Sequence, residues 1–151
     1  MTRRQGLAHC TALIAAAAGL LPTALRAAST TSTATQKVLV VGDSLSAEYG
    51  LKRGSGWVAL LEQRLADEGI AATVVNASIS GDTSAGGRAR LPGLLAQHQP
   101  SHVVLELGAN DALRGLPLAM TEENLSQMTQ AAQKAGAKVL LVGIQDRKSV
   151  V

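Results

Sequence analysis

Three short polar segments of this sequence could together form an active site, and the first contains a candidate nucleophile. The apolar residues 38–41 stop at Gly42 and are followed by Asp43, Ser44 and Leu45. In open parallel sheets, ligands bind at the carboxyl ends of the strands. Ser44, placed directly after a buried strand, is therefore the first candidate for a nucleophile. Serine also caps helices, so the same residue could instead serve only to begin a following helix.

Two further segments have the same character, because each follows an apolar stretch and contains a glycine. Gly81 lies in the polar loop that comes after residues 72–76, and Asn110 lies in the turn that comes after residues 102–107. The carboxyl ends of parallel strands meet at one edge of a sheet, so we expect all three segments to form one site. Gly81 and Asn110 are also common turn residues, and a purely structural role is the alternative for both.

Each of the three segments also contains an aspartate, and these are expected to hold the loops in shape. Asp43, Asp82 and Asp111 each lie in one of the predicted turns. Short acidic side chains commonly accept hydrogen bonds from the backbone N–H groups of a turn. We therefore do not assign any of the three as a catalytic acid.

The elements that must position these segments alternate between strand and helix, which indicates an α/β fold with a parallel sheet. Apolar spacing predicts helices at 55–68, 84–97 and 121–135 between strands at 38–41, 72–76, 102–107 and 137–144. Asp82, Thr83 or Ser84 is expected to cap the second helix, and Thr121 the third. In the first helix, the residues expected to face the core are Trp57, Leu60, Leu61 and Leu65.

The three segments resemble the first three sequence blocks of the SGNH hydrolases, also called GDSL esterases. The blocks are Gly-Asp-Ser-Leu-Ser at 42–46, Asn-Ala-Ser-Ile-Ser-Gly-Asp-Thr at 76–83 and Leu-Gly-Ala-Asn-Asp at 107–111. Their order and spacing are similar to those of the periplasmic thioesterase, lysophospholipase and arylesterase type within that family. The resemblance covers about residues 37–145. It implies a three-layer flavodoxin-like sandwich with a parallel sheet, of which the last strand and helix are missing here.

The resemblance also assigns roles to individual residues. It implies that Ser44 is the nucleophile and that the backbone N–H groups of Ser44 and Gly81, with the side-chain amide of Asn110, form the oxyanion hole. Serine needs a base to remove its proton, and the tetrahedral intermediate needs preorganised donors. The implied substrates are small acyl esters and thioesters, lysophospholipids among them, without a cofactor or a metal.

The base is the part of this machinery that the sequence lacks. Family members carry the triad aspartate and histidine in an Asp-x-x-His motif near the C-terminus, and no such motif occurs in the 151 residues. His98 and His102 are expected at the opposite edge of the sheet from Ser44, and His9 lies near the N-terminus. We therefore expect the triad Asp and His to be absent from this chain and the chain itself to be nearly inactive.

The ends of the sequence predict three segments outside the hydrolase domain, which we place at 37–145. Residues 1–27 have the basic start, apolar middle and small residues of a cleaved signal peptide, and 28–36 form a flexible polar linker. The apolar run is too short and too interrupted for a stable membrane span. Residues 146–151 match a translated sequencing adapter, so we expect a non-native tail and a truncated domain. The lone Cys10 cannot form an internal disulfide, and the protein is expected to be periplasmic or secreted.

Charge argues against a nucleic-acid partner. Three of the 14 basic residues lie in residues 1–27, which leaves 11 basic against 11 acidic residues in the remainder. Two alternatives stay open. A carbohydrate acetylesterase of the same fold would use the same residues, and a non-catalytic flavodoxin-like binding module would need none of them. Phosphate-binding glycine motifs are absent from the sequence, and so is any cluster with metal-ligand spacing.

Overall fold

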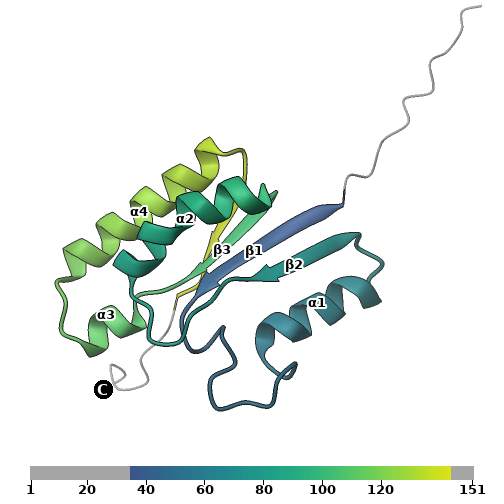
Figure 1. Ribbon diagram of the computed structural model, residues 1–151, viewed down its shortest axis with the longest axis horizontal. Helices are drawn as coiled ribbons and strands as arrows, with labels where there is room; N and C mark the ends of the chain where they lie inside the picture. The colour runs from purple at the N-terminus through teal and green to yellow at the C-terminus, as the bar shows by residue number, and fades with distance from the viewer. Residues whose placement is uncertain (1–34, 144–151) are drawn as a thin grey trace, which may run out of the picture. The chain divides into compact units, whose positions relative to one another are not determined.

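The computed structural model describes residues 35–143, which form a parallel sheet with helices on both faces (Figure 1). The expected signal peptide, nearly all of the linker and the expected tail lie outside these residues. Gln36, assigned above to the linker, is the first residue of a strand. The strands are β1 (Gln36–Gly42), β2 (Ala72–Asn76), β3 (His102–Glu106) and β4 (Lys138–Leu141). The helices are α1 (Trp57–Asp67), α2 (Ser84–His98), α3 (Ala109–Leu113) and α4 (Leu118–Lys134).

The sheet has the order β2-β1-β3-β4, and all of its neighbouring strands are parallel. This confirms the predicted α/β class, and the order is that of flavodoxin-like sheets. Strand β2 pairs with one edge of β1 and β3 pairs with the other, so the direction in which strands are added reverses at β1. A crevice forms at such a switch point, and ligands bind there. The turn after β1, which contains Ser44, and the first residues of α3 after β3, which contain Asn110, flank it.

The alternation of side chains along β1 gives the sheet two apolar faces. Leu39 and Val41 are fully buried in a core with Leu91 of α2 and Met128 of α4. Val40, between them in sequence, packs on the other face together with residues of α1 and β3. Figure 1 shows the same division, with α2 and α4 on one face and α1 on the other. The predicted three layers are therefore confirmed.

Three local predictions were wrong. Helix α4 begins at Leu118, so Thr121 lies inside it and does not cap it. Residues 109–113 form the short helix α3, where only a turn was expected. Leu60 is 56% exposed, and the buried residue of α1 is Val58, two positions earlier. The prediction for α2 was accurate, since Thr83 caps it by accepting a hydrogen bond from the Gly86 N–H.

The face of the sheet that carries α1 is only partly covered. A hollow of about 250 Å³ lies beside α1 and is lined mainly by apolar residues of that helix and of β1, β3 and β4, together with His102 and Lys138. Leu140 and Leu141 of the edge strand β4 are 59% and 52% exposed. Within residues 35–143, none of the helices has the length and apolar character needed to cross a membrane.

Candidate active site

The turn after β1 presents Ser44, whose carbonyl accepts the N–H of Tyr49 at 3.1 Å. Asp43 is buried and bends the chain, because its Oδ1 accepts the N–H of Leu45 at 3.0 Å and its carbonyl accepts the N–H of Ala47 at 2.9 Å. Within the described part of the chain, neither the hydroxyl nor the backbone N–H of Ser44 forms a hydrogen bond. No helix begins at Ser44, since α1 starts 13 residues later, at Trp57. The helix-capping alternative for Ser44 is therefore wrong.

The loop between β2 and α2 is held by two arginines, Arg90 and Arg114. Arg90 of α2 forms an ion pair with Asp82 at 2.8 Å and also donates to the carbonyl of Ala77. Arg114 donates to the carbonyl of Gly81 at 2.7 Å. The Gly81 N–H has no acceptor among residues 35–143. Gly81 has φ +80°, a left-handed conformation that glycine adopts without cost.

Asn110 joins the three segments. Its Nδ2 donates to Oδ2 of Asp43 at 3.1 Å and to the carbonyl of Asp82 at 2.9 Å, so one amide group links the turn after β1 to the loop after β2. The prediction that the three segments converge is therefore correct. An amide nitrogen has two hydrogens, and both have an acceptor here. An oxyanion in the site would have to replace or share one of these two bonds.

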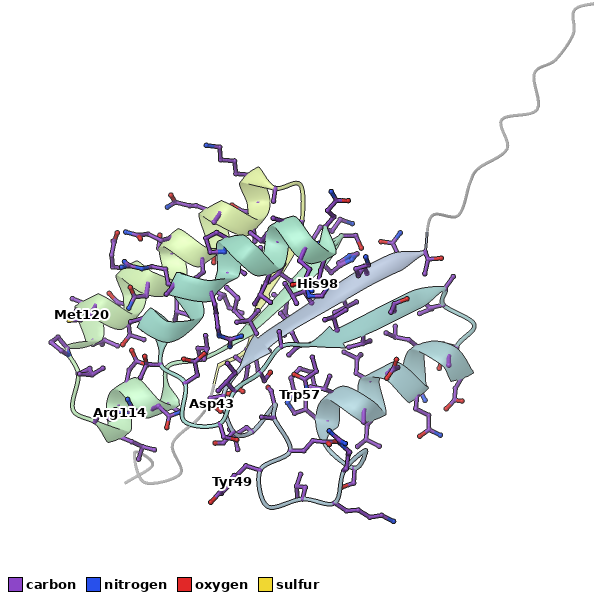
Figure 2. The ribbon with its side chains drawn as sticks, in the orientation of Figure 1. Asp43, Tyr49, Trp57, His98, Arg114 and Met120 are labelled. Atoms are coloured by element: carbon purple, nitrogen blue, oxygen red, sulfur yellow. The ribbon has the colours of Figure 1, made fainter. Side chains whose placement is uncertain are left out.

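The two histidines of the described chain lie far from this edge of the sheet. His102 is the first residue of β3, in register with Val38, and its Nδ1 is 3.0 Å from the Ser101 hydroxyl. His98 is the last residue of α2, whose first turn lies at the site. A 15-residue helix is about 22 Å long, and Figure 2 shows His98 and Asp43 well apart. Neither histidine can act as a base for Ser44 in this structure.

The sequence also matches a known protein family over most of its length. The sequence profile of the GDSL-like Lipase/Acylhydrolase family matches residues 40–149. The chain belongs to this family. The matched segment contains Ser44, Gly81 and Asn110.

Individual relatives of this GDSL-family chain support the assignment. It is 62% identical over 116 residues to Esterase TesA of Pseudomonas aeruginosa, and the match covers 77% of this chain and 58% of the relative. It is 48% identical over 112 residues to Thioesterase 1/protease 1/lysophospholipase L1 of Escherichia coli K12, covering 74% and 52%. A crystal structure of TesA superposes with a TM-score of 0.73 at 63% identity, covering 74% of this chain and 62% of that one. The chain therefore spans little more than half the length of these curated relatives.

In this GDSL-family chain the three aspartates have the loop-shaping role that was predicted. Asp111 is 2% exposed and accepts the backbone N–H of Ser84 at 2.8 Å as well as the Ser84 hydroxyl. It also accepts the Thr121 hydroxyl at 3.2 Å, and Asn124 donates to Ser84 at 2.8 Å. Asp111 thus ties the start of α2 to α4 directly behind Asn110.

A third buried acid, Glu106, is the last residue of β3 and was not predicted from the sequence. Glu106 is 3% exposed, and its Oε2 accepts the Ser46 hydroxyl at 2.8 Å. Burial raises the pKa of its carboxyl, the bond from Ser46 opposes that shift, and the charge of nearby Asp43 adds to it. The available signal was a single acid inside the apolar run 103–107, since glutamate is rarely buried in a strand without a partner.

The described residues contain no group of three or more His, Cys, Asp or Glu side chains arranged to hold a metal ion. The three segments bring a hydroxyl, two backbone N–H groups and an amide to one edge of the sheet. Groups of these kinds can bind a carbonyl group and stabilise an oxyanion.

Proposed function

We propose that this protein is a serine hydrolase that cleaves acyl esters and thioesters through an acyl-enzyme on Ser44. The observation that carries the proposal is that, within residues 35–143, the Ser44 hydroxyl and the N–H groups of Ser44 and Gly81 form no hydrogen bonds, on two loops that the Asn110 amide joins through Asp43 and the Asp82 carbonyl. The names of the relatives, an esterase and a thioesterase/lysophospholipase, are consistent with this chemistry.

In the proposed reaction, Ser44 Oγ attacks the acyl carbon while a base takes its proton. The carbonyl oxygen becomes an oxyanion, which the N–H groups of Ser44 and Gly81 and the amide of Asn110 stabilise. The bond to the leaving oxygen or sulfur then breaks, and the alcohol or thiol departs with the proton. Water releases the acid from Ser44 in a second, equivalent attack.

The base in this scheme is not supplied by the described residues. We propose that it is the histidine of an Asp-x-x-His motif in the complete protein, as the family resemblance implies. Without its triad partners, a serine-hydrolase site retains only the catalysis provided by its oxyanion hole and by binding. The 151-residue chain should consequently be nearly inactive, with only the small residual rate that the oxyanion hole and binding provide.

The substrate class and location are part of the same proposal. Small acyl esters and thioesters, with lysophospholipids among them, are the expected substrates. The N-terminal sequence pattern supports export, and we place the mature protein in the periplasm or outside the cell.

A reagent that does not depend on full turnover tests the role of Ser44. A fluorophosphonate loses fluoride when a serine oxygen attacks its phosphorus, and peptide mapping by mass spectrometry locates the label. We expect the label on Ser44 and none in Ser44→Ala. Asn110→Ala should label about 10²–10³ times more slowly, the usual effect of losing one oxyanion donor. Ser126→Ala, at an exposed position of α4, is the matched control and should label like the unmodified chain.

Two outcomes would contradict the proposal. One is labelling spread over several serines with no preference for Ser44. The other is hydrolysis of p-nitrophenyl butyrate that is well above background and persists in Ser44→Ala.

A further inference from the structure

A buried hydrogen-bonded chain lies beneath the turn that carries Ser44. Trp57 Nε1 donates to Ser46 Oγ at 3.1 Å, and Ser46 Oγ donates to Glu106 Oε2 at 2.8 Å. The same carboxyl oxygen is 3.4 Å from the backbone N of Asp43. One side chain of β3 therefore holds the residue before the nucleophile and the residue two positions after it.

The strand end is shaped to make room for this contact. Gly42 of β1 is in register with Glu106 of β3. A Cβ atom at Gly42 would lie 2.5 Å from Ser46 Oγ and 2.9 Å from Glu106 Oε2. The glycine of the Gly-Asp-Ser-Leu segment is thus needed because a carboxyl group and a hydroxyl meet against its backbone.

Burying the Glu106 carboxyl group costs free energy, which indicates that the group has a function at this position. Its Oε1 is buried without a hydrogen-bond partner in the described structure. Desolvation raises the pKa of Glu106, and Asp43, the ionisable group that faces it from the end of β1, raises it further. An amide or an apolar side chain would avoid both penalties.

We propose that Glu106 is a positioning residue of the site, which fixes the Ser44 turn through Ser46 and the N–H of Asp43. It does not touch the reacting atoms. Its effect is to set the direction of the Ser44 hydroxyl relative to the Gly81 and Asn110 donors. This inference rests on the proposed nucleophilic role of Ser44.

The conservative variant Glu106→Gln separates positioning from general stability. Glutamine keeps an acceptor for Ser46 but loses the charge that strengthens both bonds. We expect fluorophosphonate labelling of Ser44 to slow by about tenfold, the factor for one charge-assisted bond. The thermal midpoint at neutral pH should be unchanged or higher, because a desolvated charge is removed. Glu123→Gln, an exposed acid on α4, is the control and should change neither quantity.

The pH dependence of labelling and a double-mutant cycle provide two further measurements. A residue that only stabilised the fold would affect neither of them. The ratio of the two labelling rates, unmodified chain over Glu106→Gln, should fall towards one as acidification protonates Glu106, because glutamine mimics the neutral acid. The effects of Glu106→Gln and Ser46→Ala on labelling should be non-additive, since both break one contact. An unchanged labelling rate, a ratio independent of pH or additive effects would overturn the proposal.

A measurement without any reaction distinguishes failure of this inference from failure of the proposed function. In the unmodified chain, the amide ¹⁵N shift of Asp43 should titrate at a pH above 4.5, the ordinary pKa of glutamate. In Glu106→Gln, that titration should disappear. If Ser44 is not labelled and the titration is still seen, only the nucleophilic role fails. If the titration is absent from the unmodified chain, Glu106 does not hold the turn.

Discussion

Replacing Asp111 with alanine should destabilise the fold more than any other single change near the site. The carboxylate is 2% exposed and accepts hydrogen bonds from the N–H and hydroxyl of Ser84 and from the hydroxyl of Thr121. Thr121 can redirect its hydroxyl to a carbonyl of its own helix. Ser84 has no such choice, because its N–H is in the first turn of α2, where helical acceptors are lacking.

The size of the stability loss follows from the N–H and the hydroxyl of Ser84, two donors that would be left without an acceptor. A buried donor left without an acceptor costs about 1–3 kcal/mol, so Asp111→Ala should lower the free energy of unfolding by about 4 kcal/mol. That is a large share of the 5–15 kcal/mol typical of a domain. Asp111→Asn keeps one acceptor oxygen and should lose about half as much.

Urea unfolding followed by circular dichroism measures both variants against the unmodified chain. Glu122→Ala, an exposed acid on α4, controls for a simple change of charge. A loss below about 1 kcal/mol for Asp111→Ala would refute the reasoning, because it would mean that Ser84 finds other partners at little cost. An equal loss for Asn and Ala would show that the charge, not the number of acceptors, matters.

Three further predictions concern the glycines and the buried glutamate. Gly42→Ala should destabilise the fold by about 1–3 kcal/mol and slow Ser44 labelling, because the added methyl group displaces Ser46 and Glu106; urea unfolding and labelling rates measure the two effects. Gly81→Ala meets no atom closer than 3.9 Å, so its cost should be about 1–2 kcal/mol from the left-handed backbone alone, again by urea unfolding. Because the folded state raises the pKa of Glu106, the folded chain binds the proton more tightly than the unfolded one. Its stability relative to Glu106→Gln should therefore rise as the pH falls from that raised pKa towards 4.5, and urea midpoints across this range check the sign.

The sequence was sufficient for the architecture because the strands are continuous apolar runs separated by amphipathic helices. It was also sufficient for the convergence of Ser44, Gly81 and Asn110, which follows from the rule that parallel strands end at one edge. The start of α4 was misplaced for a specific reason. Thr121 has the residue type of a cap, but its hydroxyl is used by Asp111 from another helix, and no local pattern shows such a long-range partner.

Residues whose roles depend on tertiary contacts were the hardest to find. Glu106 is a single acidic residue in an apolar run, and its structural role depends on a hydrogen bond from Ser46, 60 positions earlier in the chain. The arginines that hold the Gly81 loop are similar cases. Arg90 is eight positions from Asp82, and Arg114 is 33 positions from Gly81. Hydrophobic periodicity places elements, but it carries no information about which polar side chains meet between them.

The proposed site is organised by acids to which the proposed mechanism gives no part in the reaction itself. Asp43 and the carbonyl of Asp82 hold the Asn110 amide, Asp111 holds the helix behind it, and Glu106 holds the turn that presents Ser44. Such a frame fixes the donors before a substrate arrives, which is the condition for effective oxyanion stabilisation. In the proposed mechanism it also sets a competition, because an oxyanion would have to share the Asn110 hydrogens with the carboxylate of Asp43. The two free backbone N–H groups of Ser44 and Gly81 face no such competition in residues 35–143. They should therefore bind the oxyanion first, with Asn110 contributing as its bond to Asp43 lengthens.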